Sequence, residues 1–262
     1  MRPVRRGRRP LVATLLAVIG LCGLVVAGLV VRGQLKPRTF TAAQQKRIQA
    51  WEIAKRWRTM PKTQIFPYAI NYTLADLSKP VGAKGGTLKL SASRLGIAKQ
   101  ASCGHAAGGS RSFMSVLSGQ GCQALLRSTY ADATSSLVVT AGVAVLKNKA
   151  SAMAAARFLT GGPALGQGGP ARQLVLRPFR VGGTPAALYS YPQRQLSWVV
   201  AAGSYLVMAT VGYSDGRPRV SVSSDQYALE EMTSLARGVA TRIAAPLRAP
   251  PPVLRCPGAP SC

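Results

Sequence analysis

Apolar residues fall into short segments between residues 69 and 213, either alternating with polar residues or running on without interruption. Segments of this length, bounded by Gly, Pro, Asp or Lys clusters, are typical of β-strands. The expected strands are residues 69–74, 87–90, 123–130, 136–146, 173–179, 186–189, 195–201 and 204–213. Two pairs of these predict hairpins, one turning around Asp132 and the other near Ala202-Gly203.

Three other segments repeat their apolar positions every three to four residues, which predicts helices. The expected helices are residues 41–59, 148–160 and 223–245. The first and last open with the capping-box patterns Thr41-x-x-Gln44 and Ser223-x-x-Gln226, and Asn148 is a suitable cap for the second. Pro246 is expected to stop the last helix.

Runs of adjacent strands interrupted by two helices indicate a mostly antiparallel sheet with helices packed on it, which is the α+β class. One domain with tails is the simplest division of the chain. The expected parts are a basic cytoplasmic tail (1–10), a transmembrane helix (11–31), a basic helical stalk (32–60), an extracytoplasmic α+β domain (61–248) and a Pro-rich tail (249–262).

The longest apolar run, residues 11–31, contains no charge. As a helix it is about 32 Å long, which matches the roughly 30 Å hydrocarbon core of a bilayer. A cleavable signal has a shorter apolar stretch, so a retained anchor is favoured. Cleavage near Thr39-Phe40-Thr41-Ala42 is the alternative, whereas lipidation at Cys22 is disfavoured because Leu21, which is not a small residue, precedes it.

The orientation of the anchor depends on the flanking charges. Five basic residues lie on each side within the range that counts, but those of the N-terminal side are packed into nine residues. They are Arg2, Arg5, Arg6, Arg8 and Arg9. We therefore expect a cytoplasmic N-terminus and a single-pass protein of the cell membrane with its C-terminal domain outside the cytoplasm.

Four cysteines follow the anchor, which is an even number suited to disulfides in an oxidising compartment. The preferred pairing joins Cys103 to Cys122 and Cys256 to Cys262, although four cysteines allow three pairings. Four reduced cysteines in a cytoplasmic domain are the alternative.

The helix at residues 41–59 places Ile48, Trp51, Ala54 and Trp57 near one face and five basic residues elsewhere. One interpretation is an interfacial helix with Trp51 and Trp57 in the headgroup layer and cations on anionic lipids. On the cytoplasmic side, Arg5, Arg6, Arg8 and Arg9 are the corresponding membrane-interface candidates. The other interpretation packs the Trp face on the chain's own domain.

Charge is the unusual property of this composition. The formal net charge is +27, and leaving out the five arginines of the N-terminal tail gives +22 on the rest. Such a field attracts polyanions. We expect the lipid bilayer and an anionic lipid or wall polymer as partners, and another membrane protein as a further one. Nucleic acid is not expected, because no binding motif accompanies the charge. A merely solubilising basic surface is the alternative.

Catalytic groups are scarce, since the chain has seven acidic residues and one histidine, His105. Gly212-Tyr-Ser-Asp-Gly216 matches a nucleophile elbow, but that motif needs a helix after the serine and a later histidine. We expect an ordinary turn there. Cys103 beside His105 is likewise expected to be a disulfide cysteine and a loop histidine. An envelope hydrolase using Ser214 or Cys103 is the alternative function, and no metal or cofactor is expected.

Three parts of the chain carry a resemblance: Trp57-Arg-Thr-Met-Pro61 leading to Ile65-Phe-Pro67, Leu126-Arg-Ser-Thr-Tyr-Ala-Asp132, and the stretch from Arg194 to Arg217. In layout and in these short strings the chain resembles uncharacterised single-pass membrane-anchored proteins of high-GC Gram-positive bacteria. The resemblance implies a location and no activity. The sequence therefore predicts a non-enzymatic binding or assembly domain at the cell envelope.

Overall fold

The computed structural model describes residues 40–75, 87–104, 111–162, 168–173, 175–220 and 226–251. The chain divides into two compact units, residues 1–45 and 46–262. In the first unit, Thr41 and Gln44 form the expected capping box: the Thr41 amide donates to Gln44 Oε1 at 2.9 Å, and the Gln44 amide donates to Thr41 Oγ1 at 3.3 Å. The remaining description concerns the second unit.

A seven-stranded sheet forms the centre of the second unit, and all its strand pairs are antiparallel. Its strands are β1 (Ala69–Ala75), β2 (Thr87–Ile97), β3 (Ala124–Asp132), β4 (Leu137–Val145), β5 (Gly169–Pro170), β6 (Arg194–Ala202) and β7 (Tyr205–Tyr213). The order across the sheet is β1-β2-β3-β4-β7-β6-β5. The two long hairpins, β3–β4 and β6–β7, therefore lie next to each other through β4 and β7.

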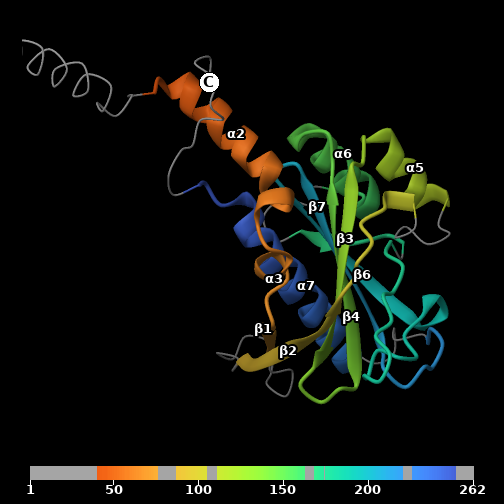
Figure 1. The fold of residues 1–262 in the computed structure, drawn as a ribbon. Coiled ribbons are helices and arrows are strands. Elements are labelled where there is room, and N and C mark those ends of the chain that lie inside the picture. Colours follow the sequence, from red (N-terminus) through yellow and green to blue (C-terminus); the bar gives the residue numbers. More distant parts are fainter. Residues whose placement is uncertain are drawn as a thin grey trace, which may run out of the picture. The chain divides into compact units, whose positions relative to one another are not determined.

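Figure 1 shows the helices that lie beside the sheet. They are α2 (Ala42–Thr59), α3 (Lys62–Ile65), α5 (Arg111–Gly119), α6 (Lys149–Thr160) and α7 (Gln226–Arg248), with a short 3-10 helix at Tyr191–Gln193. None of the described helices is both long enough and apolar enough to cross a bilayer. The expected span at 11–31, the tail at 1–10 and residues 252–262 lie outside the described residues.

Alternate side chains of the central strands face two different cores. Leu126, Val139 and Val207 belong to the larger core, which α7 covers with Met232, Leu235 and Val239 among others. Leu125, Ala144 and Met208 point to the opposite face, where α5 and α6 cover them. β3, β4 and β7 are thus covered on both faces, and for this reason they are apolar without a clear alternation.

The C-terminal half of α2 packs on the larger core. Ile53 and Trp57 of the helix contact it, and so does Met60, the residue after the helix. The Trp57 amide donates to Tyr205 Oη at 3.2 Å, and Arg56 Nη1 donates to the Pro246 carbonyl oxygen at 2.5 Å. This segment, expected as part of a stalk, is therefore attached to the α+β domain.

Most of the expected elements are present. The α+β class with an antiparallel sheet is confirmed, as are the two hairpins, the strand at 69–74 and α6 with its Asn148 cap. β2 is longer than expected, and α7 runs two residues past Pro246, because a proline in the last turn removes a hydrogen bond only there. The helix α5, which was not expected, covers the sheet together with α6.

The prediction of strands at 173–179 and 186–189 is wrong. Residues 175–190, which we call the strap, form no strand. The chain leaves the sheet edge after β5 pairs with Val199 and Trp198 of β6. It then crosses the face of the sheet, with Leu176 packed over Gly142 of β4.

Candidate functional site

A row of hydroxyl groups crosses four neighbouring strands beneath the strap. Thr129 of β3 pairs with Thr140 of β4, Thr140 with Thr210 of β7, and Thr210 with Ser197 of β6. All four residues are buried. Their side chains are joined in two pairs, Thr129–Thr140 at 2.9 Å and Ser197–Thr210 at 2.7 Å.

These hydroxyls hold the backbone of the strap. Thr129 Oγ1 donates to the Phe179 carbonyl oxygen at 2.6 Å, and the Phe179 amide donates to Thr140 Oγ1 at 3.0 Å. The Val175 amide donates to Ser197 Oγ at 3.3 Å. A buried segment outside a sheet must find such partners, because an unpaired backbone group is costly. The strap is therefore fixed in place by side chains of the sheet.

Two buried arginines supply further donors to the strap. Arg127 of β3 is 5% exposed, and its Nη1 donates to the Arg177 carbonyl oxygen at 3.1 Å. Arg194 of β6 is 2% exposed, and its Nη1 donates to the Leu176 carbonyl oxygen at 3.2 Å. The Arg194 guanidinium also lies 3.4 Å from the centre of the Tyr191 ring. Both arginines thus stabilise the strap by donating to its backbone carbonyl groups.

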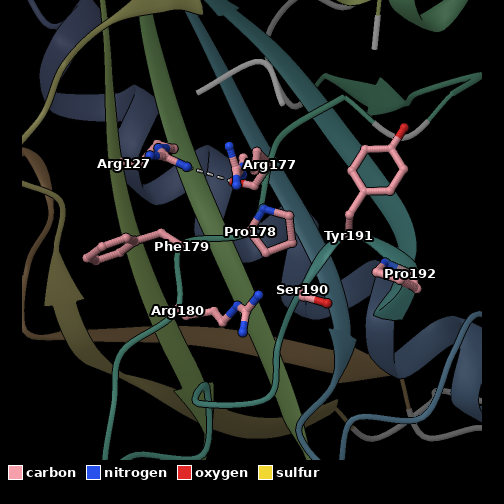
Figure 2. A pocket seen from close by; sticks show the side chains of 8 residues that line it. All are labelled: Arg127, Arg177, Pro178, Phe179, Arg180, Ser190, Tyr191 and Pro192. Carbon is pink, nitrogen blue, oxygen red and sulfur yellow. Dashed lines mark hydrogen bonds between the residues drawn. The ribbon is translucent and has the colours of Figure 1, made fainter. Parts of the chain in front are cut away.

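The strap and the sheet enclose a cavity of about 320 Å³, which we call the arginine pocket. Together, its lining residues supply three guanidinium groups, two hydroxyls and four rings. They are Arg127, Arg177, Pro178, Phe179, Arg180, Ser190, Tyr191 and Pro192 (Figure 2). Seven of the eight residues come from the strap and the 3-10 helix that follows it, and Arg127 comes from the sheet.

The charge of the arginine pocket has no acidic counterpart in the described part of the chain. Of the described residues, none places a carboxylate within ion-pair distance of Arg127, Arg177 or Arg180, and the ion pairs found are Arg217–Asp215 at 2.5 Å and Arg237–Glu230 at 3.9 Å. Burial lowers the pKa of the Arg127 guanidinium, and the charge of Arg177 lowers that pKa further. Both effects are signs of an unfavourable site for an uncompensated cation.

One nitrogen of Arg127 also lacks a hydrogen bond. Its Nε is buried and finds no partner among the described residues. A buried charged donor left in this way costs free energy that a neighbouring anion would offset. Arginine guanidinium groups bind carboxylate and phosphate oxygens through paired N–H donors. Chemically, the arrangement suits an anion.

The structure places the predicted site residues at separate points of the fold. Cys103 and Cys122 form the expected disulfide beside the smaller core, with their Cα atoms 6.3 Å apart. Trp57 is half-buried against the larger core, whereas Trp51 is 41% exposed. Cys256, Cys262, Arg5, Arg6, Arg8 and Arg9 lie outside the described residues.

The two residues of the hydrolase alternative lack the surroundings that their chemistry requires. Residues 214–220 form a turn and an extended stretch rather than a helix, and the Ser214 amide donates to the Ser136 carbonyl oxygen at 3.0 Å. Cys103 is bonded to Cys122, so its sulfur is not a thiolate. His105 lies outside the described residues. Nor do three or more His, Cys, Asp or Glu side chains gather as a metal site in the part of the chain described.

Sequence reasoning missed the arginine pocket, although two signals pointed to it. Arg127 stands in the middle of a strand that is buried along its whole length. Arg177 and Arg180 flank Pro178-Phe179, and this proline lies in the strand expected at 173–179, where it is unfavourable. The signal available in the sequence was therefore an arginine inside a buried strand with no acidic residue to pair with it.

Comparisons with protein-family models, with curated proteins and with solved structures found no match to this chain.

Proposed function

We propose that this chain is a membrane-tethered, extracytoplasmic binding domain that holds an anionic group of the cell envelope in the arginine pocket. The observation that carries the proposal is the convergence of Arg127, Arg177 and Arg180 on one cavity without a described carboxylate beside them. A non-enzymatic role fits the scarcity of catalytic groups in the sequence.

The location follows from the sequence and is supported by one bond of the structure. The apolar run at 11–31 would anchor the chain, and the compact arginines before it would stay in the cytoplasm. The Cys103–Cys122 disulfide is typical of a domain in an oxidising compartment. An anionic lipid or wall polymer is then within reach of the domain.

A purely structural role explains only part of the arginine pocket. Arg127 is needed to hold the strap through the Arg177 carbonyl oxygen. That contact involves the backbone of Arg177, so it does not explain the side chains of Arg177 and Arg180, which are exposed at the cavity. Placing two more cations beside a buried one is unfavourable unless an anion joins them.

The test measures thermal unfolding of the full chain in detergent micelles, in sulfate and in chloride at equal ionic strength. Sulfate stands in for a tetrahedral anionic group, and a bound anion raises the melting temperature by mass action. The excess stabilisation by sulfate should be lost in the double variant Arg177→Gln/Arg180→Gln. These two side chains are exposed, so the variant is expected to fold.

The matched control is Arg157→Gln/Arg242→Gln, which removes the same charge from exposed positions outside the arginine pocket. It should keep the response to sulfate. An equal loss in both double variants would show that diffuse charge rather than the arginine pocket binds the anion, and would overturn the proposal.

A further inference from the structure

The arginine pocket also indicates which kind of anion it selects, an inference that rests on the proposed function. We propose that the ligand group is a phosphomonoester carried on a small unit with a ring or another apolar body, and that phosphodiesters and carboxylates bind more weakly. Charge, pocket walls and preorganisation each point to this class.

The number of cations fits a dianion better than a monoanion. Three guanidinium groups line the cavity, and a fourth, that of Arg194, lies 3.4 Å from the centre of the lining Tyr191 ring. Burial lowers the pKa of Arg194, Tyr191 and Tyr189 raise it, and the charge of Arg219 lowers it; burial and then the charge of Arg177 lower the pKa of Arg127. A like charge therefore acts on each buried guanidinium. A phosphomonoester carries about −1.5 to −2 charge at neutral pH and three acceptor oxygens, whereas a carboxylate or a phosphodiester carries −1.

Because the guanidinium group of Arg127 is buried, the charge of the bound anion should have a large effect on affinity. Its Nε is shut off from solvent and has no described hydrogen-bond partner, so water does not compensate that part of the group. Electrostatic attraction is stronger in such a site than in water. A dianion in the adjacent cavity would offset more of the burial cost of Arg127 than a monoanion would.

The walls of the arginine pocket suit a compact body with an apolar surface. Pro178, Phe179, Tyr191 and Pro192 line it beside the arginines (Figure 2). A volume of about 320 Å³ lies at the lower end of the roughly 300–1,000 Å³ range of ligand pockets. The cavity therefore accepts one small unit, such as a phosphorylated ring or the end of a chain, rather than the interior of a polymer.

The backbone that carries the two cationic side chains of the strap is held in place before binding. Arg177 and Arg180 flank Phe179, whose amide and carbonyl groups are bonded to Thr140 and Thr129. The Tyr191 ring is stacked on buried Arg194. Because these partners fix the backbone on both sides of the cavity, little conformational entropy is lost when the anion enters.

The pH dependence of the affinity distinguishes binding of a phosphomonoester from diffuse charge attraction. The second pKa of a phosphomonoester is about 6, so the dianion is lost as the pH falls below that value. In the described part of the chain, the cavity is lined by three arginines and one tyrosine and by no histidine, lysine or carboxylate, so the group expected to titrate near pH 6 is the ligand's own phosphate. Affinity for a phosphomonoester should therefore fall on acidification, while affinity for a diester should not change.

The experiment titrates the full chain in micelles with phenyl phosphate, methyl phenyl phosphate and benzoate by calorimetry at two pH values, one above and one below 6. At the higher pH we expect phenyl phosphate to bind about tenfold more tightly than the diester or benzoate, which corresponds to about 1.4 kcal/mol. At the lower pH it should lose most of this advantage, because it has lost its second charge. Arg177→Gln and Arg180→Gln should each reduce the preference. Arg157→Gln should leave it unchanged.

Failure of this inference is distinguishable from failure of the proposed function. If the diester or benzoate binds as tightly as phenyl phosphate and still depends on Arg177 and Arg180, the arginine pocket binds anions and the phosphomonoester preference is overturned. If none of the three ligands binds in a way that depends on these arginines, both proposals fall.

Binding to vesicles then shows whether the phosphate group belongs to a lipid or to a soluble molecule. The full chain is mixed with vesicles containing phosphatidic acid, a monoester, or phosphatidylglycerol, a diester. Greater retention by phosphatidic acid that depends on Arg177 supports a lipid headgroup. Retention by neither lipid, with phenyl phosphate still bound, supports a soluble or polymer-end phosphate. Equal Arg177-dependent retention by both lipids overturns the monoester preference.

Discussion

At the scale of single residues, polar groups inside the sheet fix what covers it. Thr129, Thr140 and Ser197 are buried between the sheet and the strap, where most neighbouring strand residues are apolar. Each instead binds a backbone group of the strap. Because a buried hydroxyl without a partner is costly, these residues specify one covering segment rather than any apolar one.

Packing at one helical glycine should outweigh helix propensity. A Cβ on Gly238 of α7 would lie 2.4 Å from Tyr72 Cβ, an atom that cannot move without its backbone. Ala is favoured over Gly in a helix by about 1 kcal/mol, but overpacking costs about 1–3 kcal/mol. Chemical denaturation should therefore show that Gly238→Ala lowers the free energy of unfolding by about 1–2 kcal/mol.

Gly119, the last residue of α5, provides the matched control. No atom lies within 4 Å of the position where its Cβ would be. Gly119→Ala should leave the free energy of unfolding unchanged or raise it by about 0.5 kcal/mol. A stabilised Gly238→Ala variant would mean that α7 and β1 are not in the close contact described here.

At the scale of elements, α2 has two different faces toward its end. Trp57 packs against the larger core and its amide binds Tyr205, whereas Trp51 is 41% exposed. Trp57 thus packs on the chain's own domain, and the headgroup position stays a prediction for Trp51, whose exposed ring is of the kind found at membrane interfaces.

Stability measurements should separate the two tryptophans. Trp57→Ala removes a half-buried ring, and we expect the free energy of unfolding to fall by about 2 kcal/mol. Trp51→Ala removes an exposed ring and should change it by less than about 0.5 kcal/mol. In chains reconstituted with brominated lipids, Trp51→Phe should also abolish most of the tryptophan quenching. Quenching that persists unchanged in this variant would contradict the headgroup position of Trp51.

The disulfide joins the segment before α5 to the start of β3. Cys103 and Cys122 are 19 residues apart in sequence, and the unfolded chain loses about 3 kcal/mol of loop entropy when a loop of this size is closed. The double variant Cys103→Ser/Cys122→Ser should therefore be less stable by about that amount in urea denaturation. Reductant should destabilise the natural chain similarly and affect the variant less, and an equal effect on both would contradict the assignment.

At the scale of the whole molecule, the proposal combines an anchor, an oxidised domain and a basic pocket. In this proposal the anchor would bring the domain to a surface rich in anionic groups, where the charge of +22 beyond the N-terminal tail would raise the local concentration of anions. The arginine pocket then supplies selectivity that diffuse charge lacks.

Topology can be tested with a reporter enzyme that matures only outside the cytoplasm, fused after Cys262. We expect it to be active, because the compact N-terminal arginines favour a cytoplasmic N-terminus. A second fusion directly after Arg9 serves as the control and should be inactive. Activity only in a cytoplasmic reporter after Cys262 would contradict the proposed location.

Local sequence determined the elements whose signals are complete within a few residues. The hairpin of β6 and β7 was predictable because two apolar strands flank a turn with Gly203 at a φ of 63°. Likewise, α6 was predictable from Asn148 at its start and from Gly161, with a φ of 74°, at its end.

The tertiary structure alone decided the strap and the arginine pocket. Residues 173–179 have the apolar pattern of a strand, but the partners of Val175 and Phe179 are hydroxyls from strands more than 20 residues away in sequence. Arg127, Arg177 and Arg180 likewise meet only because the strap crosses the sheet. Periodicity reports which side of a segment is buried, whereas the position of a pocket depends on contacts between distant segments, which only the folded chain brings together.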